Sequence, residues 1–128
     1  MNPPRVLIVD DNAMNVMVAQ AALQAQGFEV ESAAGAAEAR QRVASFRPEL
    51  ILMDIQMPDV DGLTLAREFK ADPATRAIVI VAFTAFAMRG DEARMHAAGC
   101  DGYLSKPIDV NRFAGQVRAC LQAAAPPA

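Results

Sequence analysis

Aspartates stand at the ends of two apolar runs in this sequence. Asp10 and Asp11 follow the run 6–9, and Asp54 follows the run 50–53. Carboxylates brought together from two such positions repel one another, so that either one takes up a proton or a cation lies between them. Magnesium suits the second case, because it binds one or two protein carboxylates, keeps several waters and completes its shell with phosphate oxygens.

Two further polar residues follow apolar segments later in the chain. Thr84 comes directly after the run 77–83, and Lys106 ends the segment 101–106. Lys106 supplies a mobile positive charge and Thr84 a hydroxyl donor for an incoming phosphoryl group. Asp54 is the acid best placed between them to attack phosphorus and become an acyl phosphate. These residue types therefore predict phosphoryl transfer to an aspartate, if the fold brings them to one place.

An alternation of strands and helices provides that fold. Buried or alternating apolar runs predict strands over 5–10, 28–33, 49–54, 77–83 and 101–106, with 28–33 at an edge. Helices are expected over 13–26, 35–46, about 63–70, 88–99, and from a cap at Asp109 to about residue 124. Asn12 is the expected N-cap of the first helix and Gly27 its C′ residue.

The short connections require parallel strands with helices on both faces of the sheet, which defines an α/β, doubly wound fold. The carboxyl ends of parallel strands lie along one edge, where ligands bind in open sheets of this kind. The five polar residues at the strand ends are thereby gathered into one predicted site.

Composition limits the possible classes of protein. The 128 residues suit one domain, 1–128, with a core over about 5–122 and a loose tail over 123–128. A net charge of −3 gives no basic surface for nucleic acid, and the N-terminal apolar run is too short for a signal peptide or a membrane span. Two cysteines, Cys100 and Cys120, suggest reduced thiols in a cytoplasmic protein.

The segments "VDDN", "LMDIQMP", "AFTA" and "GYLSKP" resemble the motifs of the receiver domain of two-component response regulators, the CheY-like superfamily. The resemblance covers roughly residues 5–122, and each motif falls at the end of an expected strand. It implies a (βα)5 flavodoxin-like fold with a five-stranded parallel sheet in the strand order 2-1-3-4-5. It also implies a signalling module that takes a phosphoryl group from a phosphohistidine donor and catalyses only its own phosphorylation and dephosphorylation.

The resemblance implies a role for each residue of the acidic motifs. Asp54 would be the phosphoacceptor, and Asp10 and Asp11 would be the acidic pair that binds Mg²⁺ together with it. The main-chain carbonyl of Gln56 would be a further magnesium ligand.

The later motifs would respond to the phosphoryl group. By the same resemblance, the Thr84 hydroxyl would move onto the phosphoryl group and Lys106 would be its counter-ion. Tyr103 matches the aromatic switch position, and the peptide bond before Pro107 is usually cis in this family.

A partner is expected to read this change on the helix 88–99, the strand 101–106 and the closing helix. On a helical wheel, Ala93 and Ala97 share one side of the helix 88–99 and suit close packing on the sheet. The docking residues expected on the other side and on the strand are Met88, Glu92, Met95 and Tyr103. The partner would be a cognate histidine kinase or histidine phosphotransfer protein, a downstream effector, or a second copy of the domain.

Simpler interpretations exist for single residues. Asp10 and Asp11 could merely cap the first helix, although two acids before the Asn12 cap exceed that need. Asp54 alone could be a turn residue, and a lone histidine such as His96 is usually a surface residue. The combination of acids at the ends of separate strands favours the functional interpretation.

Other functions fit the pattern less well. A phosphatase of the haloacid dehalogenase type needs its aspartate nucleophile after the first strand and a second acid two residues on, where this chain has Asn12. A flavodoxin-like nucleotide binder needs a Ser/Thr/Gly-rich loop in place of "DDNAMN", and no GxxxxGK motif for a P-loop occurs. A degenerate receiver that acts only by protein contact stays open, as does the choice between a stand-alone regulator and a fragment of a hybrid kinase or larger regulator.

Overall fold

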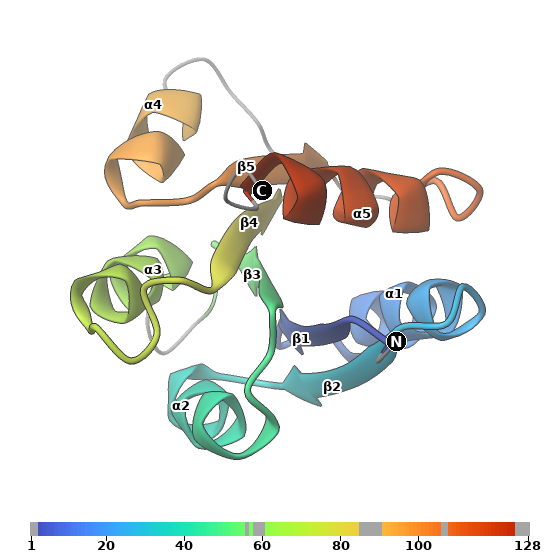
Figure 1. The fold of residues 1–128 in the computed structure, drawn as a ribbon, viewed down its shortest axis with the longest axis horizontal. Coiled ribbons are helices and arrows are strands. Elements are labelled where there is room, and N and C mark those ends of the chain that lie inside the picture. Colours follow the sequence, from blue (N-terminus) through green and yellow to red (C-terminus); the bar gives the residue numbers. More distant parts are fainter. Residues whose placement is uncertain (1–2, 56, 58–60, 85–90, 106–107, 125–128) are drawn as a thin grey trace.

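The computed structural model describes residues 3–55, 57, 61–84, 91–105 and 108–124 (Figure 1). Within them, strands and helices alternate in the order β1 (Arg5–Val9), α1 (Ala13–Gln24), β2 (Glu29–Ala33), α2 (Ala36–Phe46), β3 (Leu50–Asp54), α3 (Gly62–Ala71), β4 (Val79–Thr84), α4 (Asp91–Ala97), β5 (Gly102–Ser105) and α5 (Phe113–Ala124). The α/β prediction is confirmed. Most elements end one or two residues short of the expected bounds, and the expected residues 88–90 and 106 lie outside the described part of the chain.

All strands are parallel, and the sheet order is β2-β1-β3-β4-β5. This is the strand order that the family resemblance implies. β1 and β4 flank the central strand β3, with Val9 opposite Met53 and Phe83 opposite Asp54. The carboxyl ends of β1, β3 and β4 therefore meet at one edge of the sheet.

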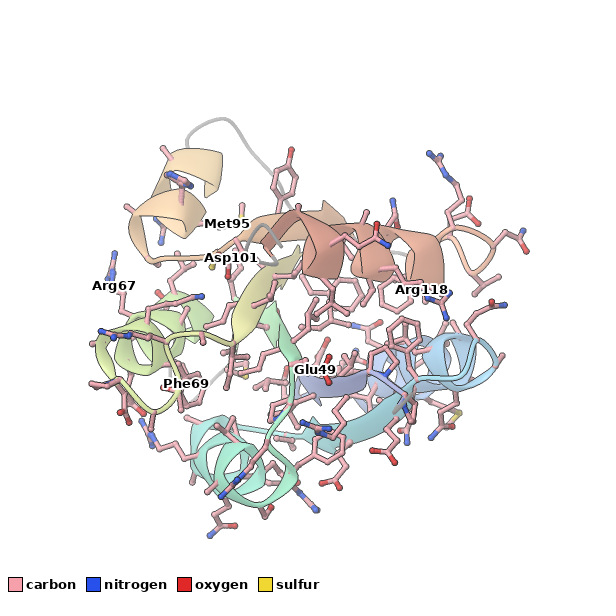
Figure 2. The ribbon with its side chains drawn as sticks, in the orientation of Figure 1. Glu49, Arg67, Phe69, Met95, Asp101 and Arg118 are labelled. Atoms are coloured by element: carbon pink, nitrogen blue, oxygen red, sulfur yellow. The ribbon has the colours of Figure 1, made fainter. Side chains whose placement is uncertain are left out.

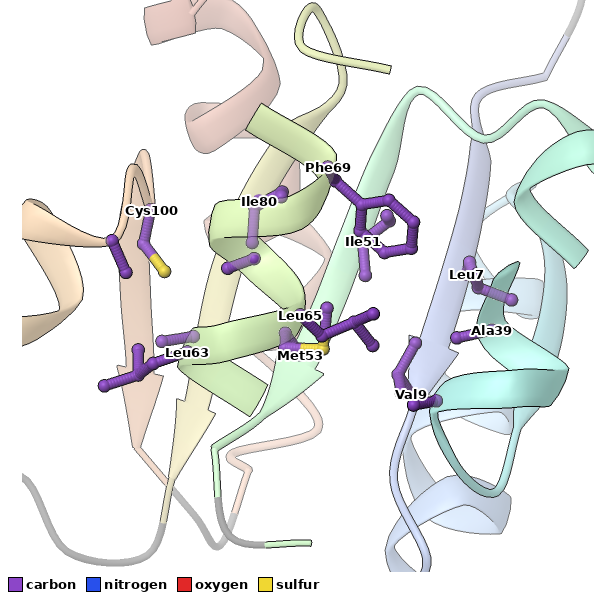
Figure 3. Close-up of a cluster of buried hydrophobic side chains, with 14 of the residues drawn as sticks. Leu7, Val9, Ala39, Ile51, Met53, Leu63, Leu65, Phe69, Ile80 and Cys100 are labelled. Carbon is purple, nitrogen blue, oxygen red and sulfur yellow. The ribbon is translucent and has the colours of Figure 1, made fainter. Parts of the chain in front are cut away.

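Helices cover both faces of the sheet, with α1 and α5 on one face and α2, α3 and α4 on the other (Figure 1). Side chains alternate between the faces with the period of two that a strand imposes. Leu7 lies beside Ala39 of α2 and Ile51 beside Phe69 of α3 (Figure 3), whereas Ile8 and Leu52 belong to the core under α1 and α5. Each such fully buried aliphatic side chain stabilises the fold by about 1.5–3 kcal/mol.

The ends of α1 follow the sequence prediction. The Asn12 side chain accepts a hydrogen bond of 3.1 Å from the N–H of Asn15, as an N-cap does. At the other end, the N–H of Phe28 donates to the carbonyl of Leu23, and Gly27 has a φ of +88°. This is a Schellman ending with glycine in the left-handed region, so the regular helix stops at Gln24 and a turn follows.

The regular part of α5 starts later than predicted, although Asp109 makes the hydrogen bonds of an N-cap. Its carboxylate accepts from the N–H of Asn111 at 3.0 Å and its carbonyl accepts from the N–H of Phe113 at 2.9 Å. A turn over 110–112 follows, and the regular helix begins at Phe113. None of the helices in the described part of the chain has the length and apolar character that a membrane span requires.

Candidate functional site

The three predicted acids meet at the carboxyl edge of the sheet. Asp10 follows β1 directly, Asp11 comes next, and Asp54 is the last residue of β3. One carboxylate oxygen from each lies within 4.8 Å of the others. Residues from two distant parts of the chain are thus brought together because β1 and β3 are neighbours in the sheet.

Two of these acids are buried and one is open to solvent. Asp10 is 2% exposed and Asp54 is 5% exposed, whereas Asp11 is exposed. The N–H of Asp10 donates to the carbonyl of Ala33 at 3.0 Å, and its carboxylate accepts from the N–H of Asn12 at 2.8 Å. The position of Asp10 is therefore fixed by the main chain of β2 and by the start of α1.

The chemistry of this cluster suits a hard divalent cation. Like charges this close repel more strongly in a buried setting than in water, and a cation between them removes that cost. Carboxylate oxygens are the ligands that magnesium takes in proteins. Asp10, Asp11 and Asp54 offer three of them within 4.8 Å of one another, and Asp11 is exposed to solvent.

A depression of about 360 Å³ borders the acids on the side of α1 and β2. It is lined by Asp10, Asp11, Ala13, Val16, Met17, Gln20, Ser32, Ala33, Ala34 and Glu38. Its neutral residues were not predicted to belong to the site. One sequence pattern could have indicated this region. Met14, Met17 and Val18 are spaced at i, i+3 and i+4, which places them on one face of α1, and Met17 of this face lines the depression.

That face of α1 is exposed. Met14 is 66% exposed and Met17 is 63% exposed, and Val18 is also exposed. The helix is anchored through Ala19 and Leu23, which are fully buried on its opposite side. Apolar side chains therefore cover the outer surface of the helix that begins beside Asp11.

Thr84 and Tyr103 lie on the two strands next to β3. Thr84 ends β4, one residue after the position opposite Asp54, and pairs with Ser105 of β5. Tyr103 is 40% exposed and lines a cavity of about 380 Å³ between α4 and β5. The predicted residues that lie outside the described part of the chain are Gln56, Met88, Lys106 and Pro107, and the side chains of Thr84 and Glu92 lie outside it as well.

The predicted orientation of α4 is wrong. Met95 is 2% exposed and packs in the core (Figure 2). Ala93 and Ala97 are exposed. Burying methionine removes more apolar surface from water than burying alanine, so this short helix turns Met95 and Ala98 toward the sheet. Met95 therefore does not belong to an exposed docking surface.

The cysteines do not take part in the site. Both are free thiols, as predicted. Burial raises the pKa of the Cys100 thiol to about 11, the neighbouring Asp101 charge adds to the rise, and Lys70 offsets part of it. Burial also raises the pKa of the Cys120 thiol. Thiols that stay protonated at neutral pH are poor nucleophiles.

Comparison with known protein families identifies the class of protein to which this fold and acidic cluster belong. The family model of the response regulator receiver domain matches residues 6–118. The chain belongs to this family, and the resemblance to CheY-like receivers in the sequence is thereby confirmed. The chain is thus a receiver domain of two-component signalling, a signalling module.

The chain is 42% identical to the polar-differentiation response regulator DivK of Brucella anthropi over 119 residues, which cover 93% of this chain and 97% of the relative. Its fold matches the CheY-like response regulator receiver domain protein of Methanospirillum hungatei with a TM-score of 0.86 and 26% identity, covering 96% and 97% of the two chains. It also matches the signal receiver domain of a signal transduction histidine kinase from Syntrophus aciditrophicus, with a TM-score of 0.83, 28% identity, and coverage of 94% and 91%.

Proposed function

We propose that this receiver takes a phosphoryl group from a phosphohistidine donor onto Asp54 and that the phosphoryl group changes its affinity for a partner. The observation that carries the proposal is the convergence of the Asp10, Asp11 and Asp54 oxygens within 4.8 Å at the carboxyl edge of the sheet. A buried carboxylate at the end of a central strand is held in one orientation, which favours attack on a bound phosphorus atom.

In the proposed transfer, one carboxylate oxygen of Asp54 attacks phosphorus. The bond from phosphorus to the donor imidazole nitrogen breaks, and its electron pair leaves with the ring, which takes up a proton. The product is an acyl phosphate on Asp54. Water attacking that phosphorus later returns the carboxylate and releases inorganic phosphate, so the module catalyses only its own phosphorylation and dephosphorylation.

Asp10, Asp11 and Asp54, with the main-chain carbonyl of Gln56, would hold the cation Mg²⁺ in this proposal. When bound, Mg²⁺ neutralises charge on the phosphoryl oxygens. The exposed carboxylate of Asp11 leaves room for the waters that magnesium keeps. The main chain of Asp10 fixes one ligand before the cation arrives.

Thr84 and Lys106 are the proposed phosphoryl contacts. The Thr84 hydroxyl would donate to a phosphoryl oxygen, and Lys106 would pair with the new negative charge. The position of Thr84 at the end of β4, next to the strand that carries Asp54, supports its part. Tyr103 on β5 would respond together with them, so that an effector or a second copy senses the change on the surface of β5 and the neighbouring helices.

The exposed apolar face of α1 is the proposed contact for the phosphodonor protein. Met14, Met17 and Val18 lie on the helix that starts beside Asp11, and Met17 lines the depression that borders the acids. Methionine adapts its shape to a partner, which suits a transient contact. Two free thiols fit a cytoplasmic location for this exchange.

The experiment is incubation with acetyl phosphate and magnesium, followed by mass spectrometry to locate the modification. We expect one modification, on Asp54, which Asp54→Asn abolishes because an amide is a far poorer nucleophile. Asp72→Asn is the matched control, because Asp72 is an exposed acid at the C-terminal cap of α3. This variant should be labelled like wild type. An unlabelled wild type would instead favour a receiver that acts by protein contact alone.

A further inference from the structure

Gly62, the first residue of α3, is buried directly against the main chain of Asp54. A Cβ atom at this position would overlap the carbonyl oxygen of Asp54 and lie 2.8 Å from the Cα of Ile55 and 2.9 Å from the carbonyl carbon of Asp54. Real Cβ atoms essentially never come within 3.0 Å of such neighbours. The φ of Gly62 is outside the left-handed region, so the lack of space alone requires glycine here.

The two sides of this contact are both held in place. The Asp61 carboxylate accepts from the N–H of Leu63 at 2.9 Å and caps α3. Leu65 is fully buried and Leu63 nearly so, and both pack in the core that α3 shares with the sheet (Figure 3). On the other side, Asp54 lies in the central strand opposite Phe83. Neither α3 nor the end of β3 can withdraw without breaking this packing.

We propose that Gly62 is a positioning residue for the phosphoacceptor, and this inference rests on the proposed function of Asp54. With no side chain at Gly62, the start of α3 lies on the peptide group that joins Asp54 to Ile55. The orientation of that peptide group also sets the direction of the Asp54 carboxylate toward Asp10 and Asp11, because both leave the same Cα. A methyl group at position 62 would push the peptide group away and turn the carboxylate out of the acidic cluster.

The test compares three variants. Gly62→Ala adds the methyl group against Asp54. Gly115→Ala adds one in the first turn of α5, where a Cβ meets nothing within 4 Å. Leu63→Ala removes packing at the start of α3 without placing an atom on Asp54. Circular dichroism gives the melting temperature of each, and the initial rate of Asp54 labelling by acetyl phosphate with magnesium is measured below all of these temperatures.

We expect Gly62→Ala to slow labelling by about 10- to 100-fold, since a displacement near 1 Å costs on the order of 100-fold in such reactions. Gly115→Ala should be labelled at the wild-type rate. Leu63→Ala should have a melting temperature at least as low as that of Gly62→Ala and still be labelled within about twofold of the wild-type rate. If Gly62 mattered only for stability, the two variants would be slowed to the same extent.

Two results overturn the inference while leaving the proposed function intact. One is a Gly62→Ala protein labelled at the wild-type rate, and the other is a Leu63→Ala protein slowed as much as Gly62→Ala. An unlabelled wild type overturns the proposed function and this inference together.

If Gly62→Ala does not fold, nuclear magnetic resonance of the wild type decides the question. Beryllofluoride with magnesium, a mimic of the aspartyl phosphate, should shift the Gly62 amide signal and leave the Gly115 amide unchanged. An unmoved Gly62 amide, with the Asp54 amide shifted, would overturn the positioning role.

Discussion

The two ends of the parallel sheet arrange their charges in opposite ways. At the amino end, Lys70 Nζ lies 2.8 Å from Asp101 Oδ2 and also donates to the carbonyl of Ile78 at 2.7 Å. At the carboxyl end, the oxygens of Asp10, Asp11 and Asp54 gather within 4.8 Å of one another. Opposite charges meet at the first end, and like charges meet at the second.

The pairing at the amino end joins several elements. Asp101 Oδ2 also accepts from the N–H of Ile80 at 2.9 Å, so that one carboxylate connects α3, β4 and the start of β5. At the same end of the sheet, the Arg5 guanidinium nitrogen Nη1 lies 3.8 Å from Glu49 Oε1, which links the starts of β1 and β3. The charged side chains at this end form ion pairs with one another and contribute to the stability of the fold.

The difference separates stability from function along one sheet. The carboxyl end carries a repulsion between carboxylates that a bound cation can relieve, whereas the amino end pairs opposite charges within the protein. Active sites commonly carry such a cost, which the rest of the fold must offset. Substitutions at the two ends should therefore change different measurements.

The largest effect on stability should come from magnesium at the carboxyl end. Because the cation binds only the folded acids, it should stabilise wild type by about 2.7 kcal/mol at a concentration 100 times its Kd. Asp11→Ala should lose most of this gain, and without magnesium it should melt no lower than wild type, since one repelling charge is gone. Circular dichroism is the suitable probe, because the chain has no tryptophan.

Asp72→Ala is the control for this prediction, because it removes an exposed acid that lies far from the cluster. It should keep the full magnesium increment. Identical melting curves of wild type with millimolar magnesium and with a chelator would contradict the claim that the carboxyl end binds a stabilising cation.

A smaller effect is expected at the amino end. Lys70→Met keeps most of the side-chain volume but removes the donor to Asp101 and to two main-chain carbonyls. It should lower the free energy of unfolding by about 1–3 kcal/mol, as expected for hydrogen bonds to a charged group. Urea unfolding followed by circular dichroism measures this change, while the magnesium increment and the labelling of Asp54 should stay as in wild type.

Arg5→Gln is the matched control at the same end. Its ion pair with Glu49 is longer, at 3.8 Å, and more exposed than that of Lys70, so its loss should cost less than about 1 kcal/mol. If Lys70→Met abolished the magnesium increment, the ends of the sheet would be coupled rather than separate.

The sequence predicted the elements best where local signals were strong. Strand ends were clear because apolar runs stop abruptly at Asp10, Asp54 and Thr84. The Asn12 cap and the Gly27 turn follow from side-chain chemistry and from backbone freedom, which act over a few residues. The strand order, in contrast, came from the resemblance to receiver domains.

Local sequence patterns of this kind do not predict contacts between segments that are distant in the sequence. A helical wheel separates Met95 from Ala93 and Ala97, but it does not say which side faces the sheet when both sides are apolar. The contact between Gly62 and Asp54 depends on how α3 returns over β3, which no spacing in the sequence reveals. The exposed side chains of α1, such as Met14, likewise appear only once the opposite side is seen to fill the core.

Phosphoryl transfer from a protein donor tests the central claim most directly. A histidine phosphotransfer domain, phosphorylated on its histidine with radioactive phosphate, is mixed with wild type or with Asp54→Asn, each with magnesium or with a chelator. The label should move to the wild-type chain with magnesium only, and none should reach Asp54→Asn. Equal labelling of Asp54→Asn, or equal transfer with the chelator, would contradict the assignment of Asp54 and of the acidic cluster around it.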